Sequence, residues 1–126
     1  MERFAWICLA GAIGTGTRYL VALWAAQRFG NALPYGTLIV NLAGCFAIAA
    51  VMHAALTLAW SPNVRVAITI GFLGGLTTYS SFNYETMRLF EEGATRAAFV
   101  NAVATIVGGF VAGGLGLFCA RQLLGR

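Results

Sequence analysis

The sequence of 126 residues contains no lysine and no aspartate, and charged residues make up only 10% of it. An ordinary soluble domain has about 25% charged residues, so the composition argues against a soluble enzyme. The charge present comes from scattered arginines and glutamates, with a net value of +4. Because the basic residues form no cluster, we expect no nucleic-acid partner.

Cysteine is also scarce. Cys8, Cys45 and Cys119 stand alone within apolar segments, which argues against a disulfide framework or a cysteine metal cluster. No hydroxyl has an evident base beside it and no nucleotide-binding motif is present, so we expect a protein that is not an enzyme.

Hydrophobic residues dominate what is there, at 60% of the chain. Four apolar segments, each long enough to cross a bilayer as a helix, alternate with short polar connections. They cover about residues 4–26, 34–59, 64–90 and 97–124. We therefore predict an all-α membrane protein in which residues 1–126 form a single integral-membrane domain with four transmembrane helices, surrounded by lipid.

The arginines are divided almost evenly between the two ends of these segments. Four spans put both termini on the same side, which receives four arginines, while the other side receives three, or four with Arg18. Basic residues in short loops set the orientation of a membrane protein. A tie therefore predicts insertion in both orientations, with two opposite copies able to pair; the alternative is that the count is too small to decide.

Polar residues interrupt the middle of the third segment. Five consecutive hydroxyl residues run from Thr77 to Ser81, just after the pair Gly74-Gly75. Glycines weaken a helix, and hydroxyls can satisfy the backbone groups that a break releases, so we predict a break here. Such breaks mark ion and substrate sites in transport proteins. The alternative is a packing face of small residues within an intact helix.

The second and fourth segments also carry polar side chains. Asn41 either lines a polar path or bonds to a neighbouring helix. Asn101 and Thr105 share a face with Gly109 and Gly113, at steps of four residues. We expect the polar pair to line a track and the glycines to pack against another helix.

The charged residues suggest the type of solute. Arg18 lies within the first segment, where its side chain would reach either the membrane interface or a water-filled vestibule and attract anions there. Glu85 lies near the end of the third segment. Residues 66–84 carry no charge, unlike the acidic rings of cation pathways. Their donors suit a small anion or a neutral polar solute, and the residues alone do not separate these two.

Three ordered motifs, spread over most of the chain, then point to a family. They are Gly14-x-x-x-Arg18-Tyr19, the run from Gly36 to Gly44 (GTLIVNLAG) and the run from Gly74 to Phe82 (GGLTTYSSF). The chain resembles the Fluc (CrcB) fluoride channels of bacteria. The resemblance implies an antiparallel, dual-topology homodimer of four-helix subunits in the bacterial inner membrane, which exports cytoplasmic fluoride passively through two pores and so reduces its toxicity. It also implies a structural sodium ion at the dimer centre.

The resemblance further implies roles for individual residues. Asn41 would donate a hydrogen bond to fluoride, and the ring edges of Tyr79 and Phe82 would face its path; Tyr79 departs from the family's usual phenylalanine. The full implied pore set is Asn41, Tyr79, Ser80, Ser81, Phe82, Asn101 and Thr105. Arg18 and Glu85 would lie in the vestibules, and the backbone carbonyls of Gly74 and Thr77 would hold the sodium.

Two other functions compete with this prediction. Small multidrug transporters are also four-span, dual-topology dimers, but they need a carboxylate in the first span, and here only Glu2 stands at its very start. A structural subunit of a larger complex would conduct no ion after purification.

Overall fold

The computed structural model describes residues 1–125, which are helical apart from short connections and contain no strand. This confirms the predicted all-α class, and the number of helical rods is the expected four. The helices are α1 (Glu2–Phe29), α2 (Tyr35–Thr57), α3 (Pro62–Val66), the π-helix η1 (Ala67–Phe72), α4 (Leu73–Leu76), α5 (Tyr79–Glu91) and α6 (Thr95–Leu124).

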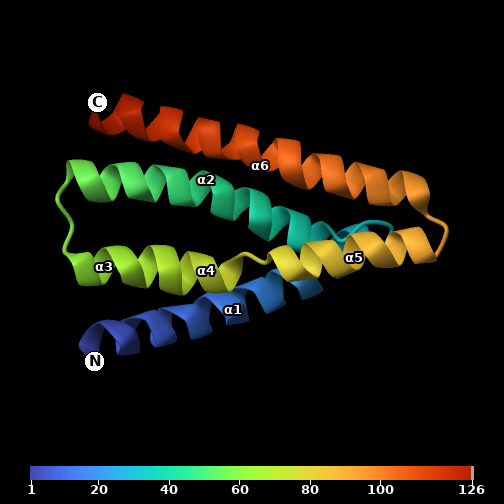
Figure 1. Cartoon of the computed structure of the whole chain (residues 1–126), viewed down its shortest axis with the longest axis horizontal. Coiled ribbons are helices and arrows are strands. Elements are labelled where there is room, and N and C mark those ends of the chain that lie inside the picture. The colour runs from blue at the N-terminus through green and yellow to red at the C-terminus, as the bar shows by residue number, and fades with distance from the viewer. Residues whose placement is uncertain (126) are drawn as a thin grey trace.

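The helices lie side by side as four long rods (Figure 1). The first rod is α1, the second α2, the third the series from α3 to α5, and the fourth α6. Both termini and the connection between α2 and α3 lie at one end, while the other two connections lie at the opposite end. The largest contact joins α2 to α6, and α1 packs against η1 and α4. Each connection thus links neighbouring ends, as four consecutive membrane crossings require.

The third rod differs from the other three. α1, α2 and α6 are each long and apolar enough to cross a membrane as a single helix. The third rod is divided instead: α4 ends at Leu76, Thr77 and Thr78 are extended, and α5 begins at Tyr79. Figure 1 shows this gap near the middle of the rod, where the hydroxyl residues predicted a break.

The π-helical turn from Ala67 to Phe72 was not predicted from the sequence. A π-turn bonds each N–H to the carbonyl five residues back, and such turns are frequent at functional sites. Its one buried residue is Gly71, where a β-carbon would come within 2.8 Å of the carbonyl oxygen of Ile7 on α1. The wide turn therefore presses its backbone directly against α1.

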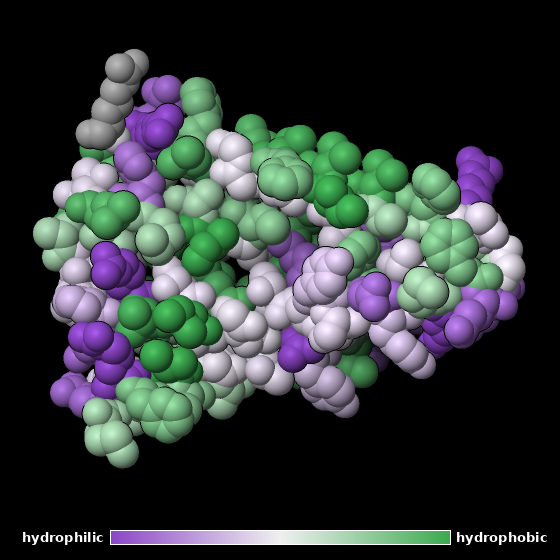
Figure 2. Space-filling view, viewed as in Figure 1, coloured by the Kyte–Doolittle hydropathy of each residue, from purple (hydrophilic) through white to green (hydrophobic). Residues whose placement is uncertain are grey.

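Apolar side chains cover the outside of the bundle. Large hydrophobic residues along α6 are highly exposed, with Phe110 at 82%. Figure 2 shows hydrophobic residues over the middle of the molecule, while the strongly hydrophilic ones gather mainly towards its two ends. An apolar band between two polar ends suits lipid rather than water, and the protein is a multi-pass membrane protein.

Glycines set the close contact between α2 and α6. A β-carbon at Gly116 would overlap the backbone carbonyl of Phe46. At the predicted packing residues Gly109 and Gly113, a β-carbon would meet Cys45 at ordinary distances of 3.4 and 3.6 Å. The tightest approach thus lies on the predicted face but one turn beyond Gly113, at a residue that the four-residue spacing did not single out.

We expect Gly116→Ala to lower the stability of the bundle by about 1–3 kcal/mol, because backbone atoms of α2 cannot move aside for the new methyl group. The matched control is Gly114→Ala on the same helix, where the methyl meets nothing within 4 Å. Thermal unfolding of the two variants in detergent, followed by size-exclusion chromatography, measures the difference. Equal melting temperatures would show that α2 and α6 do not meet at Gly116.

Candidate functional site

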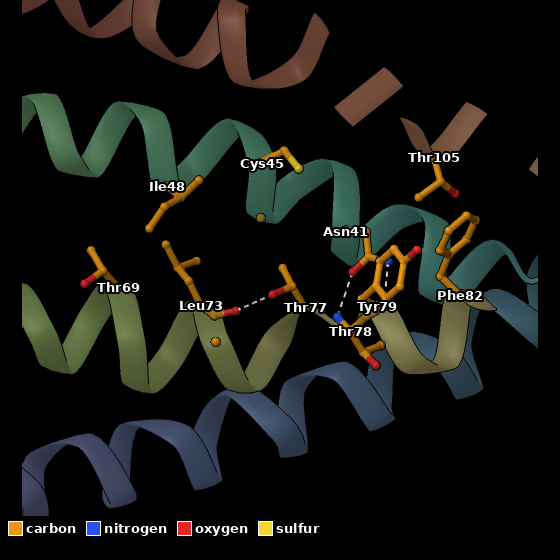
Figure 3. Close-up of a pocket in the computed structure, with 12 residues that line it drawn as sticks. Asn41, Cys45, Ile48, Thr69, Leu73, Thr77, Thr78, Tyr79, Phe82 and Thr105 are labelled. Carbon is orange, nitrogen blue, oxygen red and sulfur yellow. Dashed lines mark hydrogen bonds between the residues drawn. The ribbon is translucent and has the colours of Figure 1, made fainter. Parts of the chain in front are cut away.

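The break in the third rod is held by one side chain from α2. The Asn41 amide donates from Nδ2 to the carbonyl oxygen of Thr78 at 2.9 Å, and its Oδ1 accepts from the Thr78 backbone N–H at 2.8 Å. Figure 3 shows this amide directed at the extended residues. Asn41 therefore replaces, for one residue, the two backbone hydrogen bonds that a continuous helix would supply.

Thr78 also starts the second half of the rod. Its Oγ1 accepts from the backbone N–H of Ser81 at 3.2 Å, which makes it the N-cap of α5. The same Oγ1 lies 3.3 Å from Ser80 Oγ and donates to Ser81 Oγ at 3.1 Å. The structure thus brings the two predicted pore serines into contact with the cap, at the start of α5.

The break divides the carbonyls at the end of α4 into two groups. The Leu73 carbonyl accepts from Thr77, through both its N–H and its Oγ1. The Gly75 carbonyl accepts from Arg18 Nε at 3.1 Å and more weakly from Thr15 Oγ1 at 3.5 Å. Within residues 1–125 no hydrogen bond ends on the carbonyl oxygen of Gly74 or of Thr77. These two acceptors remain available to an ion.

Arg18 accordingly lies behind the break, on α1, where it is half-buried. The C-terminal end of a helix carries partial negative charge, which a guanidinium stabilises. The predicted vestibule arginine therefore binds the Gly75 carbonyl, one of those that the break releases. Thr15, one turn earlier on α1, donates to the same carbonyl.

A cavity of about 360 Å³ lies in front of the break. It is partly open to the outside, and Figure 2 shows a hollow in the middle of the face in view. Residues of the second, third and fourth rods line it, from α2, from both sides of the break in the third rod, and from α6. Its lining residues are Asn41, Gly44, Cys45, Ile48, Thr69, Leu73, Gly74, Thr77, Thr78, Tyr79, Phe82 and Thr105. None of these is charged.

Two aromatic rings stand at one end of this cavity. The centroids of Tyr79 and Phe82 are 5.6 Å apart with the planes at 61°, an edge-on arrangement. Phe82 is only 6% exposed, whereas Tyr79 is 78% exposed. Aromatic ring edges carry partial positive charge. Thr105, from α6, faces the same region in Figure 3.

Asn101 lies outside the cavity lining although it shares a face of α6 with Thr105. It is 2% exposed, and its Nδ2 donates to Thr86 Oγ1 at 2.8 Å. Thr86 in turn donates to the carbonyl oxygen of Phe82 at 2.7 Å. Thr86 was not among the residues predicted from the sequence, where its only signal is a hydroxyl one turn after Phe82.

Glu85 lies nearer the end of the molecule. Its Oε1 accepts from Thr37 Oγ1 at 2.8 Å, while Oε2 is buried without a hydrogen-bond partner among the described residues. A second cavity of about 360 Å³ adjoins this carboxylate, with Asn31 and Arg88 also in its lining. The predicted vestibule residue thus lies beside a hollow that is separate from the cavity at the break.

We expect Asn41→Ala to expose the break, because the Thr78 N–H loses its acceptor. Amide hydrogen exchange at Thr78, followed by NMR in detergent, should become about tenfold faster. Asn41→Asp keeps the acceptor and should preserve most of the protection. The control is Asn83→Ala, an exposed amide on α5. Unchanged exchange in Asn41→Ala would show that the amide does not hold Thr78.

Comparison with known proteins gives one consistent result. Residues 5–117 match the family described as CrcB-like protein, Camphor Resistance (CrcB). A protein of Anaeromyxobacter sp. (strain K), named fluoride-specific ion channel FluC, is 45% identical over 99% of this chain and 100% of its own length. Proteins of the same name from Sorangium cellulosum (strain So ce56) and Geobacter sp. (strain M21) are each 47% identical. The former aligns over 98% of both chains, the latter over 98% of this chain and all of its own.

Proposed function

The chain belongs to the CrcB-like family, and we propose that it is a passive, fluoride-selective channel that exports fluoride across the bacterial inner membrane. The observation that carries this proposal is the cavity at the break, which is lined by neutral donors and by no charged residue. The relatives that match over nearly the full chain are named for fluoride conduction. The residues alone allowed an anion or a neutral solute, and the family favours the anion.

The proposed pathway replaces water around fluoride with groups of this cavity. An asparagine amide has two N–H donors, and Thr78 uses only one, so the second N–H of Asn41 is available to the ion. The hydroxyl of Thr105 and the edges of Tyr79 and Phe82 supply further positive poles. Neutral donors bind an anion weakly enough to release it, which conduction requires.

We further propose that the freed carbonyls of Gly74 and Thr77 hold a sodium ion. Both residues line the cavity, and neither carbonyl oxygen accepts a hydrogen bond within residues 1–125. Half-helix C-terminal ends bind sodium in other membrane proteins. No cluster of acidic, histidine or cysteine ligands occurs in the described chain, so carbonyls are the fitting donor set. The ion would neutralise the negative end of α4 where two copies meet.

The open side of the cavity supports an antiparallel homodimer. A single copy leaves the neutral donors exposed to one side, whereas in a membrane such groups must face protein or water. A second copy would close the cavity and bring two more carbonyls to the sodium. The balanced arginines favour insertion in both orientations, which an antiparallel pair needs.

The direct test of the proposed function is ion efflux from liposomes that contain the purified protein. We expect rapid fluoride efflux and little chloride efflux. Phe82→Ile should slow fluoride at least about tenfold, because it keeps an apolar side chain but removes the ring edge. The control is Phe110→Ile on the lipid-facing side of α6, which should conduct normally.

Equal fluxes of fluoride and chloride would contradict the selectivity. No flux at all would favour a structural subunit. Export of cationic drugs coupled to protons would favour a small multidrug transporter. The composition of α1 argues against that function, because the one carboxylate of α1 is Glu2, at its first residue.

The dual orientation predicts that an impermeant maleimide added to whole cells labels about half of the chains at a single cysteine. A suitable site is the exposed Glu91, replaced as Glu91→Cys in a chain whose three native cysteines are removed. Labelling after the cells are opened gives the total. Labelling of all or of none of the chains in intact cells would rule out the antiparallel dimer.

A further inference from the structure

Thr86 occupies an unusual position among the hydroxyls of the bundle. Its Oγ1 donates to the Phe82 carbonyl at 2.7 Å and accepts from Asn101 Nδ2 at 2.8 Å. A hydroxyl has one proton, so the bond to Phe82 leaves its lone pairs for Asn101. The three groups form a short chain of hydrogen bonds from α6, through α5, to the backbone of the ring residue.

This chain of bonds is buried. Thr86 is 9% exposed and Asn101 is 2% exposed. Groups so placed would be costly to leave unpaired, and hydrogen bonds in a low-dielectric interior strengthen one another. Thr17 makes a similar bond to the carbonyl four residues back, on Ile13, yet no partner from another helix joins it among the described residues. Thr86 thus differs from Thr17 in that its hydroxyl also bonds to a side chain of another helix.

The mechanical consequence concerns the rotation of α5. The backbone is extended at Thr77 and Thr78, so α5 does not inherit its direction from α4. Asn41 holds the residue just before α5, and Thr86 joins the helix to α6 two turns further on. Phe82 lies between these two points. Glu85 also bonds to Thr37 on α2, so loss of the Thr86 contact leaves α5 with polar contacts to α2 alone. The helix can then shift relative to α6, and the ring moves with it.

We propose that Thr86 is the positioning residue for the Phe82 ring, and that Asn101 acts through Thr86 rather than by contact with the ion. The role for conduction rests on the proposed function, since the ring edge matters for flux only if fluoride passes it. The placement of the ring can be tested without any flux. The burial of Asn101 away from the cavity supports this division of roles.

The first test observes the ring itself. Fluorophenylalanine incorporated at Phe82 gives a ¹⁹F NMR signal in the full-length protein in detergent. We expect Thr86→Val and Asn101→Leu to shift or broaden this signal in the same way, and Thr86→Ser, which keeps the hydroxyl, to leave it unchanged. Thr17→Val is the matched control and should also leave it unchanged.

The second test measures fluoride efflux with unlabelled protein. Thr86→Val and Asn101→Leu should each slow efflux about fivefold, as expected for the loss of one interhelical hydrogen bond in a membrane. The double variant should be no slower than either single one, because both remove the same contact. Thr86→Ser should restore the rate.

Several outcomes would overturn the proposal. One is an unchanged ¹⁹F signal in both Thr86→Val and Asn101→Leu. Another is a change in one of them only, or additive losses of flux, which would separate Asn101 from Thr86. If Thr86→Val does not fold, Asn101→Leu decides through the ¹⁹F signal. If the wild type passes no fluoride, the proposed function fails while the ¹⁹F comparison still decides the placement of the ring.

Discussion

The reciprocal pair of hydrogen bonds between Asn41 and Thr78 is the constraint on which the site depends. A break in a membrane helix exposes polar backbone groups to a medium without water, and each one left unpaired costs several kcal/mol. The asparagine amide offers a donor and an acceptor in the geometry of a peptide group, so it can satisfy both groups of one residue. An aspartate side chain could accept from the Thr78 N–H but could not donate to its carbonyl. A serine side chain is too short to reach both groups.

Once the break is held, it separates charges of opposite sign. The end of α4 presents carbonyl oxygens, of which Arg18 takes one from behind while those of Gly74 and Thr77 stay free. The start of α5 lies next to it, with its own cap and the two rings. Helix ends carry partial charges, negative at the C-terminus and positive at the N-terminus. One interruption thus suits both the proposed sodium site and the proposed fluoride path, without any ionised side chain in the cavity.

Much of this was predictable from the sequence, because it follows from composition and from local chemistry. The four apolar segments and a break within the hydroxyl run, which the structure has at Thr77 and Thr78, needed only hydropathy and the runs of glycine and hydroxyl residues. The partners across helices were not predictable. Nothing in the spacing pairs Thr37 with Glu85 or Thr86 with Asn101, since such pairs depend on how two helices rotate against each other.

The π-turn and the contact at Gly116 were not predicted from the sequence either. A π-turn changes the rotational phase of every residue after it by about one position, so faces counted with a regular period of 3.6 residues no longer apply to the end of the third rod. Gly109 and Gly113 meet α2 at ordinary contact distances, yet the backbone of α2 comes closest at Gly116 on the same face, because the crossing of the two helices decides at which turn they approach most closely.

The half-helix α5 shows why a broken helix needs more fixed points than an intact one. A continuous helix transmits its direction and rotation along its length through its own hydrogen bonds, whereas an extended pair of residues transmits neither. Side chains must restore the lost restraints, and α5 has one interhelical polar contact to α2 at Glu85 and one to α6 at Thr86. Two contacts on different neighbours define both tilt and rotation. An aromatic ring between the break and these contacts can therefore be held as firmly as one in an unbroken helix, while the break keeps its carbonyls open to an ion.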